Sequence, residues 1–154
     1  MYIEVKLKLI TNFLGGGSRK SGVRQLKRTS DNRIAIDEND WRSDISEAAE
    51  SLGLDFNTTS IKFELGFDPV KVCTLRRTYN KVNVEMFEGI PSGTNLSIFL
   101  YADKREENCP SLKDIKKVIE VFGKFFGISQ FGKKFQCGRF EVKEINLLDK
   151  NNYK

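Results

Sequence analysis

The sequence has 154 residues, a length that suits one domain with its own hydrophobic core, and 39% of these residues are hydrophobic. It carries a net charge of +5 and contains no histidine, which excludes Ser-His-Asp and Cys-His nucleophilic systems. No apolar run reaches the roughly 20 residues that span a bilayer. Cys73, Cys109 and Cys137 include no C-x-x-C pair, so reduced thiols are favoured over a zinc site. We therefore expect a cytoplasmic protein without cofactor or metal.

The first segment alternates apolar and charged residues from Ile3 to Leu9, a pattern typical of a half-buried strand. Gly15, Gly16, Gly17 and Ser18 then predict a flexible loop, because successive glycines suit neither a strand nor a helix. A basic segment follows, with no acid between residues 15 and 30. Its five cations, which equal the whole net excess, are Arg19, Lys20, Arg24, Lys27 and Arg28. A short strand is expected at residues 32–36.

Residues 37–40 (Asp-Glu-Asn-Asp) supply capping and dipole-favouring side chains ahead of a helix. The apolar stripe of that helix, at helical spacing, consists of Trp41, Ile45, Ala48, Ala49 and Leu52. Gly53 follows as a C-terminal stop. The carboxylates could also suggest a metal site, but helix capping already accounts for them.

The middle of the chain predicts strands at 61–67, 70–78 and 81–88, the last two forming a hairpin around Tyr79-Asn80. Residues 89–93 (Gly-Ile-Pro-Ser-Gly) predict a turn. The strand that follows, around residues 96–101, is apolar on both faces, as expected for a central strand. A second helix opens at Pro110-Ser111, where Ser111 and Asp114 resemble a capping box. Its buried face is Ile115, Val118, Ile119, Phe122 and Phe126.

A final strand is expected at residues 139–147, and residues 149–154 form a polar tail. The order of elements predicts one α+β domain, residues 1–148, of the ferredoxin-like (RRM-like) βαββαβ class with a hairpin elaboration. Its two helices pack on one face of an antiparallel sheet. The other face is left free to meet a partner.

The most specific stretch is the glycine-rich loop between the second helix and the last strand. Gly127, Gly132 and Gly138 let the backbone approach a polyanion and let amides point at phosphates. Lys133, Lys134 and Arg139 supply charge. Phe131 and Phe135 can stack on bases, although the competing interpretation packs these rings between helix and sheet and leaves the lysines in solvent.

The loop, FFGISQFGKKFQCGRFEV, resembles the C-terminal glycine-rich signature of the RAMP superfamily, the repeat-associated RNA-binding proteins of CRISPR systems. LITNFLGGGSR resembles the end of their first strand and its loop, and WRSDISEAAESLGL resembles the helix of their backbone subunits. FEGIPSGTNLSIFL resembles the hairpin before their central strand. Ser129 and Gln130 depart from the signature, which often has glycine and arginine there. The chain resembles a minimal subunit, which could be virus- or mobile-element-encoded.

The resemblance implies single-stranded, guide-like RNA as partner, together with copies of the chain itself or CRISPR effector subunits, and no membrane. From the first loop it implies contacts by Gly15, Gly16, Gly17, Ser18, Arg19 and Lys20, continuing through Arg24, Lys27 and Arg28. From the glycine-rich loop it implies contacts by Gly127, Gly132, Lys133, Lys134, Gly138 and Arg139. Separately, Arg76 and Arg77 precede Tyr79 near a hairpin tip, where they can grip RNA or simply discourage edge pairing.

Two alternatives to a non-catalytic RNA-binding protein stay open. A phage or mobile-element protein of this fold could act by protein–protein contact, for example as a CRISPR inhibitor. A metal-dependent ribonuclease could use Asp31, although an aspartate in a Ser-Asp-Asn stretch is more often a turn residue. Some RAMP proteins cleave RNA with a histidine as general acid or base, and this sequence has no histidine. We therefore expect that the chain is not an enzyme.

Overall fold

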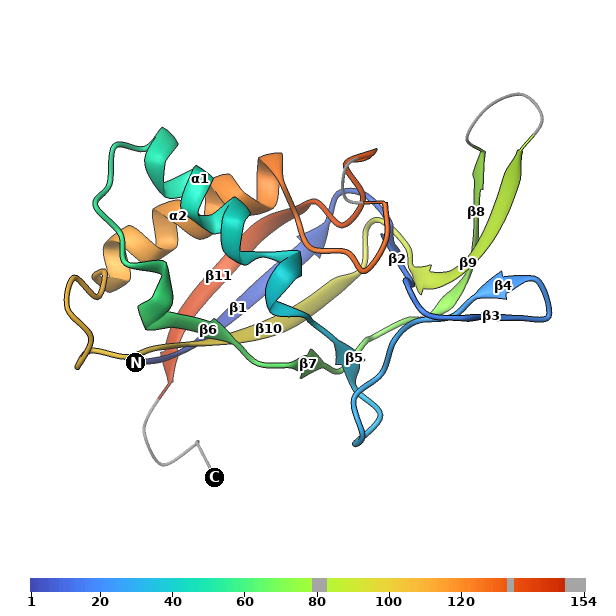
Figure 1. Cartoon of the computed structure of the whole chain (residues 1–154), viewed down its shortest axis with the longest axis horizontal. Helices are drawn as coiled ribbons and strands as arrows, with labels where there is room; N and C mark the ends of the chain where they lie inside the picture. Colours follow the sequence, from blue (N-terminus) through green and yellow to red (C-terminus); the bar gives the residue numbers. More distant parts are fainter. Residues whose placement is uncertain (79–82, 133–134, 149–154) are drawn as a thin grey trace.

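A computed structural model describes residues 1–78, 83–132 and 135–148 of the chain. Its main sheet has four strands: β1 (Tyr2–Leu9), β10 (Asn95–Ala102), β11 (Phe140–Leu148) and β6 (Ile61–Phe63). They lie in the order β11-β1-β10-β6, and each neighbouring pair is antiparallel (Figure 1). The strand predicted from the alternation of residues 3–9 is therefore confirmed. The strand predicted around residues 96–101 is central in the sheet, as expected.

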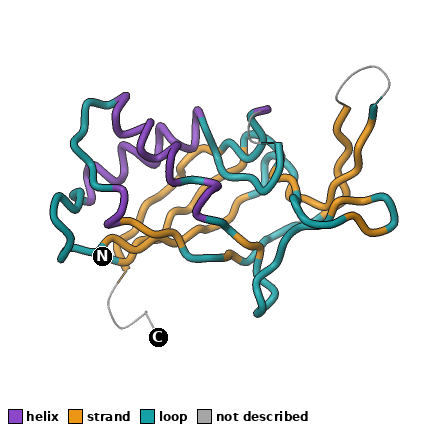
Figure 2. Tube along the Cα trace, viewed as in Figure 1, coloured by secondary structure: helices purple, strands orange, loops and turns teal. Residues whose placement is uncertain are grey.

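The helices α1 (Arg42–Ser51) and α2 (Leu112–Phe125) cover one face of this sheet (Figure 2). In α2 the Ser111 side chain accepts a hydrogen bond from the Asp114 amide at 3.2 Å, so the predicted N-cap is confirmed. Ahead of α1, residues Glu38–Asp40 form a 3₁₀ turn, η1, and Gly53 ends the helix with φ +68°. The predicted stripe is wrong at Leu52, which is 39% exposed because the helix ends before it.

The core lies between helices and sheet. Ile3, Val5 and Leu7 point from β1 toward the helices and are 0–3% exposed. Trp41 meets Phe63 edge-on at 4.9 Å between ring centroids, and the core continues along α2 to β11. Burying this many aliphatic and aromatic side chains is the main force that holds the two layers together.

A second, smaller sheet extends from one end of the main sheet (Figure 1). It contains β2 (Phe13–Leu14), β3 (Arg19–Lys20), β4 (Val23–Arg24), β8 (Cys73–Thr78) and β9 (Val84–Ile90). Strand β9 pairs antiparallel with β8, which confirms the predicted hairpin, and on its other side with β2 and, in parallel, β4. We call residues 13–28 and 70–90 the lobe; residues 79–82 of its hairpin tip lie outside the described residues.

Two of the places where strand boundaries differ from the sequence prediction are close approaches of another backbone to a glycine. The predicted strand 61–67 is divided into β6 and β7 (Gly66–Phe67), and β7 pairs with β5 (Ile34–Ala35), the expected short strand. A Cβ on Gly66 would lie 3.0 Å from the Ile34 carbonyl oxygen. Residues 89–90, predicted as part of a turn, end β9 instead, and a Cβ on Gly89 would lie 2.3 Å from the Phe13 carbonyl oxygen.

The architecture is thus α+β, with antiparallel pairing in each sheet and a two-helix layer on the main one. A short 3₁₀ turn, η2 (Thr58–Ser60), leads into β6. Neither α1 nor α2, the α-helices of the described residues, has the length and apolar character needed to cross a membrane.

Gly123 of α2 offers a test of this packing. A Cβ there would lie 2.4 Å from the Phe140 ring and 2.8 Å from the Phe140 carbonyl oxygen. Gly123→Ala should therefore lower the free energy of unfolding by about 1–3 kcal/mol, measured by urea denaturation. In a helix with free space the same change would raise it by roughly 1 kcal/mol. Lys116→Ala, at an exposed position of the same helix, is the control and should have little effect; an equal or more stable Gly123→Ala variant would contradict the packing.

Candidate nucleic-acid interface

The glycine-rich loop is attached to the start of the lobe by the side-chain amide of Gln130. Its Oε1 accepts hydrogen bonds from the backbone N–H groups of Gly16 at 3.1 Å and Lys27 at 2.7 Å. Its Nε2 donates to the carbonyl oxygens of Lys27 at 2.8 Å and Ala35 at 3.0 Å. All four hydrogen-bonding positions of one amide are used, so one side chain joins three separate stretches of backbone.

The preceding residue reinforces this connection. The Ser129 hydroxyl accepts from the Leu14 amide at 2.9 Å and lies within hydrogen-bond distance of the carbonyl oxygens of Leu14 and Phe131. Ser129 is 2% exposed. Ser129 and Gln130, two of the positions that depart from the RAMP signature (Cys137, where an aromatic residue is common, is a third), therefore both hold the loop against β2 and the basic segment.

The glycines of the loop serve close packing. A Cβ on Gly138 would lie 1.8 Å from the Ile128 carbonyl oxygen, and one on Gly127 would lie 2.4 Å from the Gly138 carbonyl oxygen. The amide of Gly127 donates to the carbonyl oxygen of Phe122, a hydrogen bond that closes the end of α2. The amide of Gly138 donates to the carbonyl oxygen of Asn12. The expectation that these two amides point at phosphates is therefore wrong. Gly132, with φ +77°, accepts hydrogen bonds from the amides of Phe135 and Cys137.

Gly15, Gly16 and Gly17 form a loop as predicted, but a tightly packed one. A Cβ on any of them would lie 2.5–2.8 Å from the backbone of Gln25, Leu26 or Gln130. Their amides donate to the Glu88 carbonyl oxygen, to Gln130 and to the Gln25 carbonyl oxygen. Ser18, the fourth residue of this predicted site, is exposed and accepts from the Gln25 amide at 3.0 Å.

Three arginines of the basic segment form ion pairs with β9. Arg19 and Arg24 both contact Glu85, at 2.6 and 3.0 Å, and Arg28 lies 3.5 Å from Glu88. The segment contains no acidic residue, but the fold places Glu85 and Glu88 of β9 beside it. Lys20 and Lys27 are exposed, and neither forms an ion pair within the described part of the chain.

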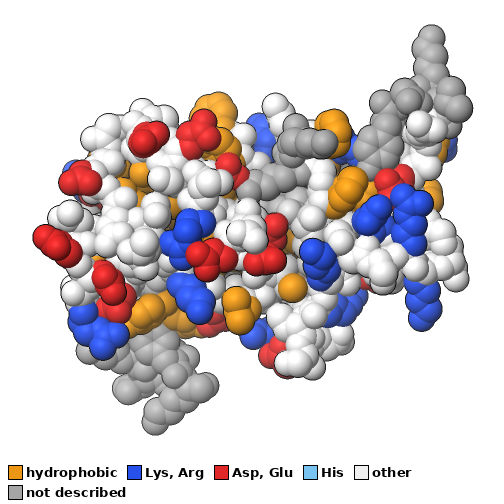
Figure 3. Space-filling model, in the orientation of Figure 1, with side chains coloured by type: hydrophobic (Ala, Val, Ile, Leu, Met, Phe, Trp, Pro, Cys, Tyr) orange, Lys and Arg blue, Asp and Glu red, His pale blue; other side chains and the backbone are white. Residues whose placement is uncertain are grey.

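The lobe as a whole is still strongly basic. Its described residues contain eight lysines and arginines and only the two glutamates of β9. This excess of six is larger than the net charge of the entire chain, +5. Figure 3 shows basic side chains gathered over the lobe and more acidic ones over the helical end. A localised excess of this size attracts a polyanion to one end of the molecule.

Arg77 joins the hairpin to the glycine-rich loop. Its guanidinium lies 4.4 Å from the ring centroid of Phe135 and donates to the Cys137 sulfur at 2.8 Å. Burial raises the pKa of the Cys137 thiol above its ordinary value, and the Arg77 charge opposes that shift. Phe135 is 45% exposed beside a hollow of about 290 Å³ that Arg76 and Arg77 also line. Two of the predicted segments therefore meet at one place.

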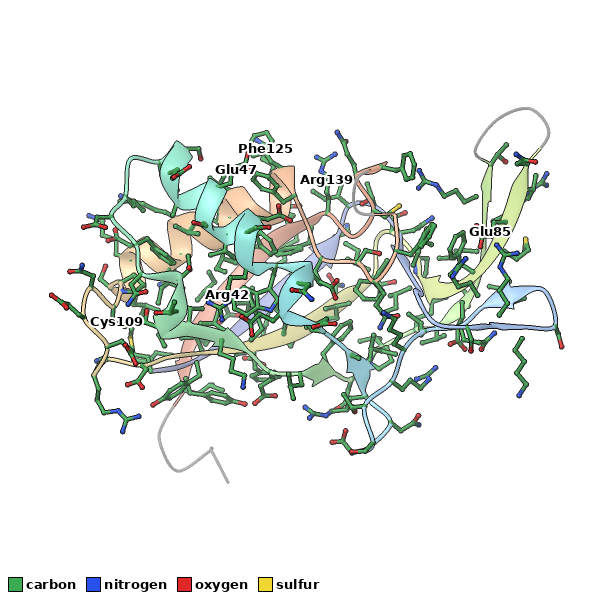
Figure 4. All side chains as sticks on the ribbon, viewed as in Figure 1. Arg42, Glu47, Glu85, Cys109, Phe125 and Arg139 are labelled. Carbon is green, nitrogen blue, oxygen red and sulfur yellow. The ribbon has the colours of Figure 1, made fainter. Side chains whose placement is uncertain are left out.

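The remaining predicted contacts are differently placed. Phe131 is half-buried, 4.9 Å from Phe87 and beneath Arg24, so its ring is not free to stack on a base. Arg139 donates to the carbonyl oxygen of Lys124 at 2.6 Å and thereby caps α2. Phe125, 61% exposed, lies near Arg139 at the end of α2 and was not among the predicted residues (Figure 4). Lys133 and Lys134 lie outside the described residues.

Carboxylates supply no metal centre in the described part of the chain: no group of three or more His, Cys, Asp or Glu residues there could hold an ion. Asp31 accepts hydrogen bonds from Thr29 and Arg33, which hold the pKa of its carboxyl below the ordinary value. Asp40 accepts from the Asp37 amide at 3.0 Å, as expected of capping residues. The three cysteines are free thiols.

Sequence reasoning expected a free face of the sheet but did not identify the aromatic residues on it. Tyr2, Phe99 and Tyr101 lie on the face of the main sheet that the helices leave uncovered. Phe99 and Tyr101 were interpreted as the second buried face of a central strand, but Tyr101 is 43% exposed. The alternation of aromatic residues on β10 was the available signal.

No family model matches this sequence, and no curated protein matches it. Among solved structures, the chain is similar to a chain in the cryo-EM structure of the Type III-B Cmr-beta bound to cognate target RNA. The TM-score is 0.57 at 14% identity, and the match covers 94% of this chain and 59% of that one. The two chains share a fold, and this chain spans about three-fifths of the length of its neighbour.

The Gln130 attachment predicts a specific pair of effects. Gln130→Ala removes partners from four backbone groups and should lower the free energy of unfolding by about 1–3 kcal/mol. Gln130→Glu keeps the shape but places carboxylate oxygen against two carbonyl oxygens, so it should be at least as destabilising. Urea denaturation and tryptic cleavage after Lys20 and Lys27 measure both effects. Gln25→Ala, which loses one local hydrogen bond to Val23, is the control; wild-type protection in Gln130→Glu would contradict the attachment.

The Cys137 environment predicts an order of thiol reactivity. Only thiolates react with iodoacetamide, and Cys137 is both 5% exposed and raised in pKa. At pH 8, Cys137 should be alkylated more slowly than Cys73 and Cys109, which are partly exposed. Mass spectrometry of digested protein resolves the three sites. Equal rates would show that Arg77 and the loop do not enclose Cys137.

Proposed function

We propose that this protein is a non-catalytic, single-stranded-RNA-binding relative of CRISPR effector backbone subunits, and that it binds the phosphate backbone along the lobe. The observation that carries this proposal is the excess of six positive charges on the lobe, at one end of a chain whose net charge is +5. Neutralising phosphates releases counterions, which makes such a localised excess a strong contributor to nucleic-acid affinity.

The cations divide into two groups with different tasks. Arg19, Arg24 and Arg28 are engaged by Glu85 and Glu88 and hold β3, β4 and β9 together. Lys20, Lys27 and Arg76 are exposed on the same lobe and are the residues we assign to phosphate contact. Arg77 beside the exposed ring of Phe135 adds a place where a base can stack next to a cation.

The fold supports the same assignment. The element order β1-α1-β6-β10-α2-β11 and the sheet order β11-β1-β10-β6 fit a ferredoxin-like βαββαβ domain with the lobe as its elaboration. The neighbour of known structure belongs to a Type III-B Cmr assembly with target RNA. Together with the motifs that resemble RAMP proteins, this favours a role in a CRISPR ribonucleoprotein, with effector subunits or further copies of the chain as protein partners.

RNA binding is tested by affinity as a function of salt. For a fluorescein-labelled single-stranded RNA, the triple variant Lys20→Ala/Lys27→Ala/Arg76→Ala should bind more weakly than wild type. The slope of log affinity against log salt should become shallower by about 2, since each single-strand phosphate contact contributes about 0.7. Nuclease-sensitive absorbance that co-purifies with the wild-type protein would support the same conclusion.

The matched control is Lys113→Ala/Lys116→Ala/Lys117→Ala, which removes the same charge from exposed positions of α2. It should leave the slope close to that of wild type. Equal weakening by both triple variants would contradict the lobe as the site. Absence of RNA binding by the wild-type chain, together with a stable complex with a protein partner, would overturn the proposed function in favour of a protein–protein role.

A further inference from the structure

We propose that the open face of the main sheet is a second binding site, at which unpaired bases of single-stranded nucleic acid stack on Tyr2, Phe99 and Tyr101. This goes beyond the proposed function, which assigns phosphate contacts to the lobe. Its ligand is a flexible single strand, because the faces of bases inside a duplex are covered by their neighbours.

The three rings occupy the two central strands of the sheet. Tyr2 of β1 lies directly opposite Tyr101 of β10, and Phe99 lies on the same face two residues earlier. The Tyr2 and Phe99 rings are stacked, with centroids 5.8 Å apart and planes 15° from parallel. Tyr101 is 43% exposed, and no helix of the described chain covers this face (Figure 1). The rings therefore form a platform of fixed orientation.

Cations stand beside the rings. Lys62 of β6 is paired in register with Tyr101, so its side chain emerges on the same face. Lys62 and Lys104 line a hollow of about 1100 Å³ together with Tyr2 and Tyr101. Both lysines are exposed, and neither forms an ion pair within residues 1–78, 83–132 and 135–148. A strand whose bases stack on the rings would place its phosphates within reach of these ammonium groups.

Polar groups continue along the same face. A second hollow of about 550 Å³ is lined by Phe99, Asn95 and Ser97. Its lining also contains Glu4 and Asp68, and two lysines that pair with glutamates of β11, Lys6 with Glu144 at 3.8 Å and Lys143 with Glu141 at 3.3 Å. An amide and a hydroxyl next to an aromatic ring can pair with the polar edges of a base. Aromatic faces, neighbouring cations and hydrogen-bonding groups together fit a nucleotide chain better than an apolar protein segment, which would leave Lys62 and Lys104 without partners.

The site lies at a distance from the lobe. Tyr2 follows the N-terminus, which Figure 1 places at the end of the sheet opposite the lobe. Strand β10 runs from the lobe toward this end, so Asn95, Phe99 and Tyr101 succeed one another along the path between the two sites. A single strand held by its phosphates on the lobe can therefore extend across the sheet.

The test compares RNA with an abasic oligonucleotide of the same length, which keeps the phosphates but lacks bases. Tyr101→Ala and Phe99→Ala should each weaken binding of single-stranded RNA by about 5- to 100-fold. Binding of the abasic strand, and the salt slope, should stay at wild-type values. Tyr101→Phe, which keeps the ring, is the matched control and should retain most of the affinity.

The outcomes separate this site from the lobe. Because Tyr101 is exposed, its alanine variant tests the platform even if Phe99→Ala unfolds, and circular dichroism verifies the fold of each. Unchanged RNA affinity in folded Tyr101→Ala, or equal loss for RNA and abasic strand, would overturn the platform while leaving the lobe assignment intact. The same unchanged affinity is expected if this face binds a protein instead. A shallower salt slope in the lobe variant with no effect at Tyr101 would confirm the proposed function alone.

Discussion

The arrangement of the lobe on the domain depends on one side-chain amide. Gln130 gives both of its acceptor positions to backbone N–H groups and both of its donors to carbonyl oxygens, in three stretches of backbone around residues 16, 27 and 35. These bonds, together with those between Ser129 and Leu14, hold the glycine turn at residues 15–17 and the backbone at Lys27 against the loop that joins α2 to β11. That attachment positions the backbone of the basic segment. The ion pairs of Arg19 and Arg24 with Glu85, and of Arg28 with Glu88, then hold the segment against β9.

Local patterns predicted the main layers well, whereas pairings over long distances could not be predicted. The alternation from Ile3 to Leu9 and the Ser111 cap are properties of neighbouring residues, so β1 and α2 could be recognised directly. The neutralisation of Arg19 and Arg24 depends on Glu85, and only the parallel register of β4 with β9 brings those groups together. Likewise, nothing near Gln130 in the sequence indicates its partners at residues 16, 27 and 35.

The burial of individual aromatic side chains could not be predicted from the sequence either. Phe131 and Phe135 stood in similar positions of the sequence, yet Phe131 packs against Phe87 whereas Phe135 reaches the surface beside Arg77. Phe99 and Tyr101 suggested a fully buried strand because their residue types are those of a core. Both helices lie on the same side of the sheet, as predicted, but the apolar residue types on both faces of this strand concealed which of its side chains the helices leave exposed. The division leaves a charged lobe at one end of the molecule and exposed aromatic residues on one face of the main sheet.

The attachment through Gln130 also has a consequence for the growing chain on the ribosome. Gly16 and Gln130 are separated by 114 positions in sequence, so the amino-terminal basic segment leaves the exit tunnel long before its anchor is made. During that interval residues 15–35 lack the four hydrogen bonds of Gln130, although β4 can already pair with β9, and Arg19 and Arg24 with Glu85. The attachment is completed only after residue 130 has been released, which makes it a late event in biosynthesis compared with the pairing of β9. A chain that ends just before residue 130 would keep α1, α2 and β10 but would lose β11 and this attachment of the basic segment.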